Sequence, residues 1–234
     1  MKSIMLCNSA FPWFEKNSRL IFVLALCGFI AACGTDSENK QEPAPIVNIT
    51  NGQFDVVAIM PEDLTNEDGA PFGSGSLSFK YSGDDSGAFS VSGPLAIGQI
   101  QNDAVGATLV KLEENDLGTQ NEGFTVVGFH PLGNGKADIF VLGTKTNTSV
   151  LPIKNGDAFG IGPLEFFNGL FLKGIKISDW WDVNTNKLEV AEIAYTIESG
   201  FIQFATRDST HFRGTFAGTT ATGPNISPLP FLLQ

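Results

Sequence analysis

Apolar and polar residues alternate along much of the chain from Ile46 onward. Residues 76–81 read Ser-Leu-Ser-Phe-Lys-Tyr, so every second side chain is large and apolar. Residues 88–93 repeat the pattern after a turn-forming segment rich in Gly, Asp and Ser. A period of two is that of a β-strand with one buried face. The two segments therefore predict a β-hairpin whose core face carries Phe79 and Phe89.

A second hairpin is predicted at residues 201–219, with its turn at 207–210. Here Phe212 and Phe216 share the inner face, whereas His211 and Arg213 fall on the outer face. The predicted core therefore includes Phe204 and Phe216 as well as the two phenylalanines of the first hairpin. Six more strands are predicted from apolar runs bounded by turn residues, at residues 54–60, 105–112, 124–129, 137–144, 171–178 and 188–197.

This count of roughly ten strands predicts an all-β fold, an antiparallel β-sandwich or barrel, and we favour a packed sandwich. Residues 187–199 are less clear, because their apolar positions also fit a helix that Gly200 would terminate. We favour a strand. Its alternation changes phase at Ala191–Glu192, which predicts a β-bulge there.

The first 32 residues have the pattern of an export signal. Lys2, Lys16 and Arg19 precede an apolar run from Leu20 to Ile30, and small residues follow it. Such a run is too short for a membrane span, which needs ~20 residues. We expect residues 1–32 to be removed, residues 33–45 to form a flexible tether and residues 46–234 to form one all-β domain.

The end of this region, Ile30-Ala31-Ala32-Cys33, resembles the lipobox of bacterial lipoproteins. The resemblance implies that Cys33 becomes the N-terminus and the lipid attachment site, carrying several acyl chains. Anchoring by more than one chain is stable, since each buried CH₂ contributes about 0.8 kcal/mol. Gly34 stands where an Asp would retain such a lipoprotein in the inner membrane. The implied location is therefore the bacterial cell envelope, at the outer membrane.

Composition supports a folded, acidic module. Hydrophobic residues make up 42% of the chain and aromatic residues 11%, enough to build a core. Removal of residues 1–32 takes away three of 14 basic and one of 25 acidic residues, which leaves 11 against 24 and a net charge of −13. This charge argues against a nucleic-acid partner. Cys7 and Cys27 leave with the signal, so no disulfide is expected.

The closing stretch, residues 200–218, ends in Gly-Thr-Phe-Ala-Gly and is similar to the last hairpin of uncharacterised β-rich bacterial lipoprotein families. Residues 79–93 resemble an opening hairpin from the same kind of protein. These motifs are structural. The resemblance implies the fold and the location, and it implies no activity.

Residues that carry chemistry are few. We expect His130 and His211 to be ordinary surface or strand-end residues, and the chain lacks a Gly-x-Ser-x-Gly nucleophile motif. With two histidines and no free cysteine pair, a zinc site is short of ligands. The adjacent acidic residues of Asp84–Asp85 and Glu113–Glu114 are interpreted as solvated turn residues. The short Gly-x-Gly pieces are interpreted as turns, because none completes a phosphate-binding motif. We expect no catalytic residue, no metal and no cofactor.

Three segments remain candidates for ligand contact. Trp180 and Trp181 are adjacent, so in a strand one of them would face outward, where it could stack on a sugar or an apolar ligand. Asp182-Val-Asn-Thr-Asn186 has alternate oxygen donors, but it departs from a calcium loop at its sixth and twelfth positions, so a turn is favoured. The Phe-rich segment 159–171 is interpreted as core, with an apolar loop over a ligand mouth as the alternative.

Three functions fit these observations. The favoured one is a non-enzymatic lipid-anchored envelope module that acts by binding a protein or glycan or as a structural part. The second is a barrel that carries an apolar ligand, which requires a hollow interior. The third is a glycan-acting enzyme that uses two carboxyl groups.

Overall fold

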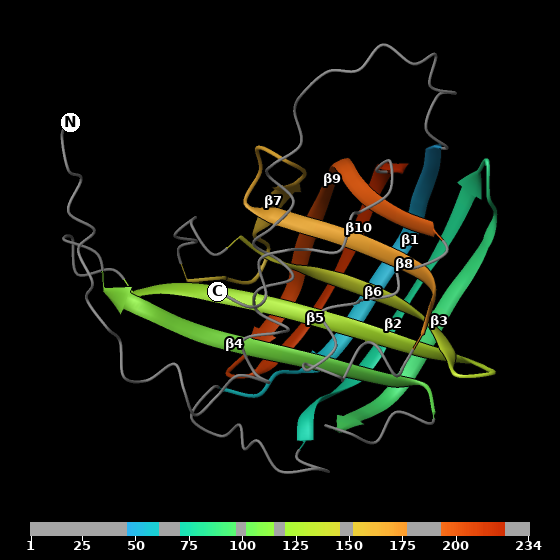
Figure 1. Ribbon diagram of the computed structural model, residues 1–234. Coiled ribbons are helices and arrows are strands. Elements are labelled where there is room, and N and C mark those ends of the chain that lie inside the picture. The colour runs from blue at the N-terminus through green and yellow to red at the C-terminus, as the bar shows by residue number, and fades with distance from the viewer. Residues whose placement is uncertain are drawn as a thin grey trace, which may run out of the picture.

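The computed structural model describes residues 46–60, 71–96, 102–114, 120–145, 152–176 and 193–222. Ten strands make up the fold (Figure 1). Their bounds are β1 (Ile46–Val57), β2 (Pro71–Gly83), β3 (Gly87–Ala96), β4 (Ala104–Glu114), β5 (Gln120–Gly133), β6 (Lys136–Thr144), β7 (Ala158–Ile161), β8 (Phe167–Lys176), β9 (Ile193–Asp208) and β10 (His211–Thr222).

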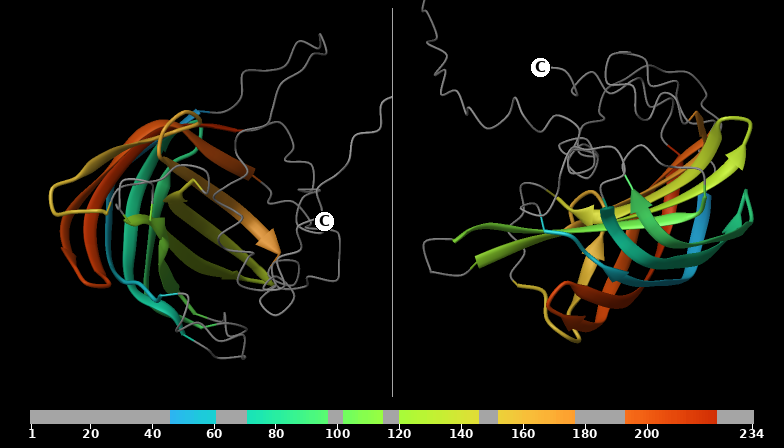
Figure 2. Two further views of the ribbon diagram at one scale, coloured as in Figure 1. Left: turned by 90° about the vertical axis from the view of Figure 1, so that its left-hand side faces the viewer. Right: turned by 90° about the horizontal axis from the view of Figure 1, so that it is seen from below.

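The strands form a closed barrel in the order β1-β10-β9-β7-β8-β6-β5-β4-β3-β2. Closure follows from β1, which pairs antiparallel with both β2 and β10 and so joins the first strand to the last. Figure 2 shows the sheet curving round on itself. The all-β prediction is confirmed. The preference for a packed sandwich is wrong, because the strands are linked in one closed order around the core. The link between β3 and β4 is the single parallel pairing of Pro94 with Val105.

Aromatic side chains fill the inside of the barrel. Phe79 of β2 contacts Phe140 of β6 at 4.7 Å between ring centroids, and it contacts Phe171 of β8 at 5.2 Å and Phe216 of β10 at 5.9 Å. These rings come from different sides of the wall and meet in the middle. The predicted core is confirmed for Phe79, Phe89, Phe204 and Phe216, each of which is at most 3% exposed.

The outer surface of the wall has two different halves. Strands β5, β6 and β8 are apolar on both faces, and their outward side chains form a second buried cluster that includes Phe129, Ile139 and Leu172. Strands β10, β1, β2 and β3 carry small polar side chains outside. In one row across them Ser76 pairs with Asp55 and with Ser92. Only this second half shows the clean alternation typical of a one-sided strand.

The uncertain region near Gly200 is strand wherever the structure describes it. β9 runs unbroken from Ile193 to Asp208, and Gly200 lies within it instead of ending a helix. The β-carbon of any other residue at position 200 would meet the Ala217 carbonyl oxygen and the Gly218 backbone. The predicted bulge at Ala191–Glu192 lies outside the described residues.

The Phe-rich segment 159–171 forms β7, the turn that follows it and the start of β8. Phe159 packs on Phe167 at 5.5 Å and on Phe204 at 6.1 Å between centroids. The core interpretation therefore holds for these rings. Leu164 and Phe166 in the turn are exposed instead, at 98% and 45%. The four-residue strand β7 was not predicted.

Candidate functional site

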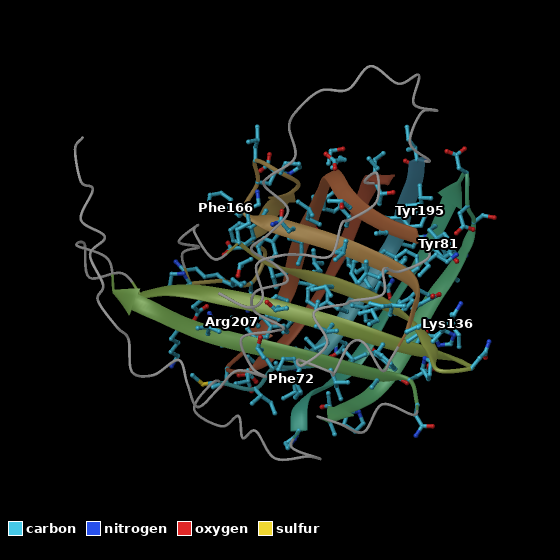
Figure 3. The ribbon with its side chains drawn as sticks, viewed as in Figure 1. Phe72, Tyr81, Lys136, Phe166, Tyr195 and Arg207 are labelled. Carbon is cyan, nitrogen blue, oxygen red and sulfur yellow. The ribbon has the colours of Figure 1, made fainter. Side chains whose placement is uncertain are left out.

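A cluster of polar side chains lies at one end of the aromatic interior. Lys173 of β8 donates hydrogen bonds to Asp85 at 2.5 Å and to the Tyr81 hydroxyl at 3.2 Å. Tyr195 of β9 approaches the same carboxylate at 3.5 Å. Asp85 belongs to the turn between β2 and β3, so this cluster links that turn to β8 and β9. Its two tyrosines, Tyr81 and Tyr195, are labelled in Figure 3. The alternation of β8 places Lys173 on the inner face, two residues beyond Phe171.

The charges in this cluster stabilise one another. The hydrogen bond from Lys173 lowers the pKa of the Asp85 carboxyl below its ordinary value. Burial alone would lower the pKa of Lys173, but its hydrogen bonds with Asp85 and Tyr81 outweigh that effect and raise the pKa. Burial raises the pKa of the Tyr195 hydroxyl. Lys173 and Asp85 therefore stay ionised over a wide pH range, and each neutralises the other.

A second ion pair lies away from the first, between β5 and β9. Arg207 of β9 donates to Glu122 of β5 at 2.6 Å and to the Ile153 carbonyl oxygen at 2.6 Å. The other oxygen of Glu122 accepts the Ile153 N–H at 3.1 Å. The Glu122 side chain is 7% exposed, and the Arg207 guanidinium lies over the ring of Phe212. The pair is thus satisfied by hydrogen bonds and covers the Phe204–Phe212 end of the core.

Between these two clusters, the interior of the barrel is aromatic. Aromatic rings in mutual contact occupy the middle of the barrel. Each ion pair joins strands or turns that are distant in sequence, and each of its charges faces a partner.

Both histidines lie outside the core and contact carboxylates. His211 approaches Asp55 at 2.5 Å, and the other oxygen of Asp55 accepts a hydrogen bond from Arg213 at 2.9 Å. The hydrogen bond with His211 lowers the pKa of Asp55. His130 approaches Asp103 at 2.7 Å. The predicted outward direction of His211 and Arg213 is confirmed, and their partner on β1 was not predicted.

Most of the residues singled out for lipid or ligand contact lie outside the described ranges. Cys33, Trp180 and Trp181 lie outside the described residues, as does the 182–186 segment. The prediction for Asp84–Asp85 is right for one residue of the two. Asp84 is an exposed turn residue whose carboxylate accepts the Ile46 N–H at 2.8 Å. Asp85 contacts Lys173 instead, and the one sequence signal for such a partner is that Lys173 is the single charged residue of segment 167–175.

Within the ranges that the structure describes, no three His, Cys, Asp or Glu side chains converge to hold a metal ion. Nor does any helix among these residues have the length and apolarity needed to cross a bilayer.

The geometry defines a class of protein, a closed ten-stranded β-barrel with an aromatic interior held by an ion pair at each end. Comparison of the chain with protein-family models, curated proteins and solved structures finds no significant match.

Proposed function

We propose that this protein is a lipid-anchored, non-enzymatic module of the bacterial cell envelope that acts through its outer surface. The observation that carries the proposal is the interior, where rings such as Phe79, Phe140 and Phe216 contact one another across the barrel. A carrier of an apolar ligand needs that volume empty. Binding is therefore assigned to the outside of the wall.

The outer face of β10, β1, β2 and β3 is the part of that surface best suited to a polar partner. Thr215, Gln53, Ser78 and Ser90 form one row across the four strands. Short hydroxyl and amide side chains donate and accept hydrogen bonds at low entropic cost, which suits a protein or glycan surface. The envelope offers both classes of partner.

Support for the anchor is the lipobox-like segment, with Cys33 as the acylated residue and the outer membrane as the location. The test is fractionation of cells that express the full chain or its Cys33→Ser variant. We expect the parent protein in the membrane fraction and the variant in the soluble fraction, because a chain without acyl groups loses its anchor. Identical sedimentation of the two would overturn the proposed anchor.

The assignment of binding to the outer surface has its own test. Native mass spectrometry of the processed protein, extracted from its host membranes, should give the mass of the acylated chain alone. A stoichiometric apolar small molecule that stays bound after detergent exchange would contradict the filled-barrel argument. It would favour the carrier function instead.

A further inference from the structure

The turn between β7 and β8, residues 162–166, presents apolar side chains to solvent. Leu164 is 98% exposed and Phe166 is 45% exposed. A large apolar side chain with nearly all its surface in water gains nothing from the fold. The turn is therefore a candidate contact for something outside the barrel.

The turn holds this shape through hydrogen bonds. The Gly162 N–H donates to the Phe167 carbonyl at 2.9 Å, and the Glu165 N–H donates to the Gly162 carbonyl at 3.1 Å. Lys145 adds two more bonds from β6, with its N–H to the Phe166 carbonyl at 3.0 Å and its ammonium to the Pro163 carbonyl at 2.5 Å. The exposed leucine is thus held outward on a fixed frame.

The one acidic side chain of the turn, Glu165, is exposed between the two apolar residues. The Glu165 carboxylate lies directly against Gly160 of β7. It also interacts favourably with the Lys145 ammonium and so raises the Lys145 pKa, against the larger lowering effect of burial. The Glu165 charge thus has a cationic neighbour, and Leu164, at 98%, is the most exposed large apolar side chain of the turn.

This turn lies at the end of the barrel where the chain enters β1. Gly162 abuts Glu198 of β9. The adjacent Ser199 pairs with Thr219 of β10, and Thr219 pairs with Asn48 of β1. Figures 1 and 2 show the β7–β8 turn and the start of β1 at the same end of the molecule. Ile46, the first residue of β1, adds a third exposed apolar side chain at this end, 51% exposed.

The distance to the proposed anchor is short. An extended chain covers at most ~3.6 Å per residue, so residues 34–45 keep Ile46 within about 45 Å of Cys33. A flexible chain of this length would have a typical end-to-end distance of about 20 Å. The tether therefore keeps the Ile46 end of the barrel close to the lipid surface. For the turn at this end, the effective concentration of lipid is high.

We propose that the β7–β8 turn inserts Leu164 and Phe166 into the interfacial region of the bilayer and so sets the orientation of the barrel on the membrane. The inference rests on the proposed anchorage at Cys33. The occupant is lipid because the exposed apolar side chains are at the end that the anchor holds against the membrane. In this orientation the polar outer face of β10, β1, β2 and β3 stands upright from the surface, open to a partner.

The test uses a fluorophore at position 164. After processing, the acylated chain has no free thiol, because Cys7 and Cys27 lie in the signal. Leu164→Cys is labelled with an environment-sensitive dye, and the purified lipoprotein is reconstituted into phosphatidylcholine vesicles. Val57→Cys is the matched control, since Val57 is 46% exposed but ends β1, at the opposite end of that strand from Ile46. We expect a blue shift, a gain in intensity and quenching by bromolipids at 164, and none of these at 57.

Flotation of the vesicles separates the possible failures. Protein that floats with the vesicles while the dye at 164 keeps its aqueous emission would overturn the inference and leave the anchor intact. Equal shifts at 164 and 57 would also overturn it, because they would indicate contact without orientation. Protein that fails to float would overturn the proposed anchorage and this inference together.

Discussion

At the scale of single residues, the Lys173–Asp85 and Arg207–Glu122 ion pairs differ from the pairs on the outer wall, because they include residues at inward positions of strands. Glu122 and Lys173 occupy inward positions on β5 and β8 that the pattern reserves for apolar side chains. Each is tolerated because a charged partner and further hydrogen bonds satisfy it. By contrast, Arg213 and Asp55 are exposed on the outer wall. Loss of an ion pair should therefore lower the free energy of unfolding much more at an inward position than on the outer wall.

Arg207→Met should lower the free energy of unfolding by about 3–5 kcal/mol, because it leaves the buried Glu122 carboxylate without its counterion. Arg213→Met is the matched control, and removal of its exposed pair with Asp55 should cost no more than ~1 kcal/mol. Urea unfolding of both variants measures the difference. Equal losses would show that the Glu122–Arg207 pair has no special role in the fold.

The Lys173–Asp85 pair predicts a defined dependence of stability on pH. The folded-state pKa of Asp85 is lowered, so its contribution is present above its unfolded pKa of about 4 and is lost as pH falls through the folded value. The folded-state pKa of Lys173 is raised, so its contribution is present below its unfolded pKa of about 10.4 and is lost as pH rises through the folded value.

The expected measurement is the difference in unfolding free energy between the parent protein and Lys173→Met as a function of pH. It should be level between about pH 5 and pH 9 and should shrink on the acid side as Asp85 is protonated. Tyr195 also belongs to the cluster, so the alkaline limb will include its ionisation. A difference that grows on acidification would refute the assigned pairing.

At the scale of elements, the alternation of apolar and polar residues predicted the inner face of a strand best where the other face is exposed to solvent. Strands β2, β3 and β10 belong to the half of the barrel with a polar outer face, and Phe79, Phe89 and Phe216 on them were assigned correctly. Strands β6 and β8 have apolar residues on both faces, as in Ile139-Phe140-Val141, so their existence was predictable but their inner face was not. The short β7 lacks enough residues to show any period.

The candidate site was the least predictable part, since it depends on pairs that are distant in sequence. Asp85 and Lys173 are 88 residues apart, and Glu122 and Arg207 are 85 apart. No local pattern encodes either contact. The alternative of a helix ending at Gly200 failed for a similar reason. A glycine near the end of a helical pattern resembles a terminator, whereas here it allows β9 and β10 to approach closely.

That close approach gives a test at the level of the β9–β10 pair. Gly200→Ala should lower the unfolding free energy by about 1–3 kcal/mol, because the new methyl group meets backbone atoms of β10 that have little room to move. Gly123→Ala in β5 is the control, since its nearest neighbour is the Thr144 side chain at 3.3 Å. Thermal or urea unfolding of the two variants gives the comparison. A greater loss at 123 would contradict the packing described for β9 and β10.

At the scale of the whole molecule, stability depends on rings that meet from different sides of the wall. Phe79 contacts rings of β3, β6, β8 and β10. Its packing therefore depends on strands from several parts of the barrel wall. Phe79→Ala should therefore cost about 3–5 kcal/mol of unfolding free energy. Phe201→Ala, at a half-exposed position on the outer wall, should cost far less. Similar losses in urea unfolding would contradict the inward assignment.

Closure of the barrel also sets the order in which the protein can finish folding. The hydrogen bond from the Val47 N–H to the Thr220 hydroxyl joins residues 173 positions apart. During synthesis, β1 is therefore complete long before β10, the strand that completes its pairing. Until β10 arrives, β1 has an unpaired edge that another chain can occupy. Contacts this distant form slowly. A nascent chain truncated before Phe212 should therefore aggregate or require a chaperone, although nine of its ten strands are already present.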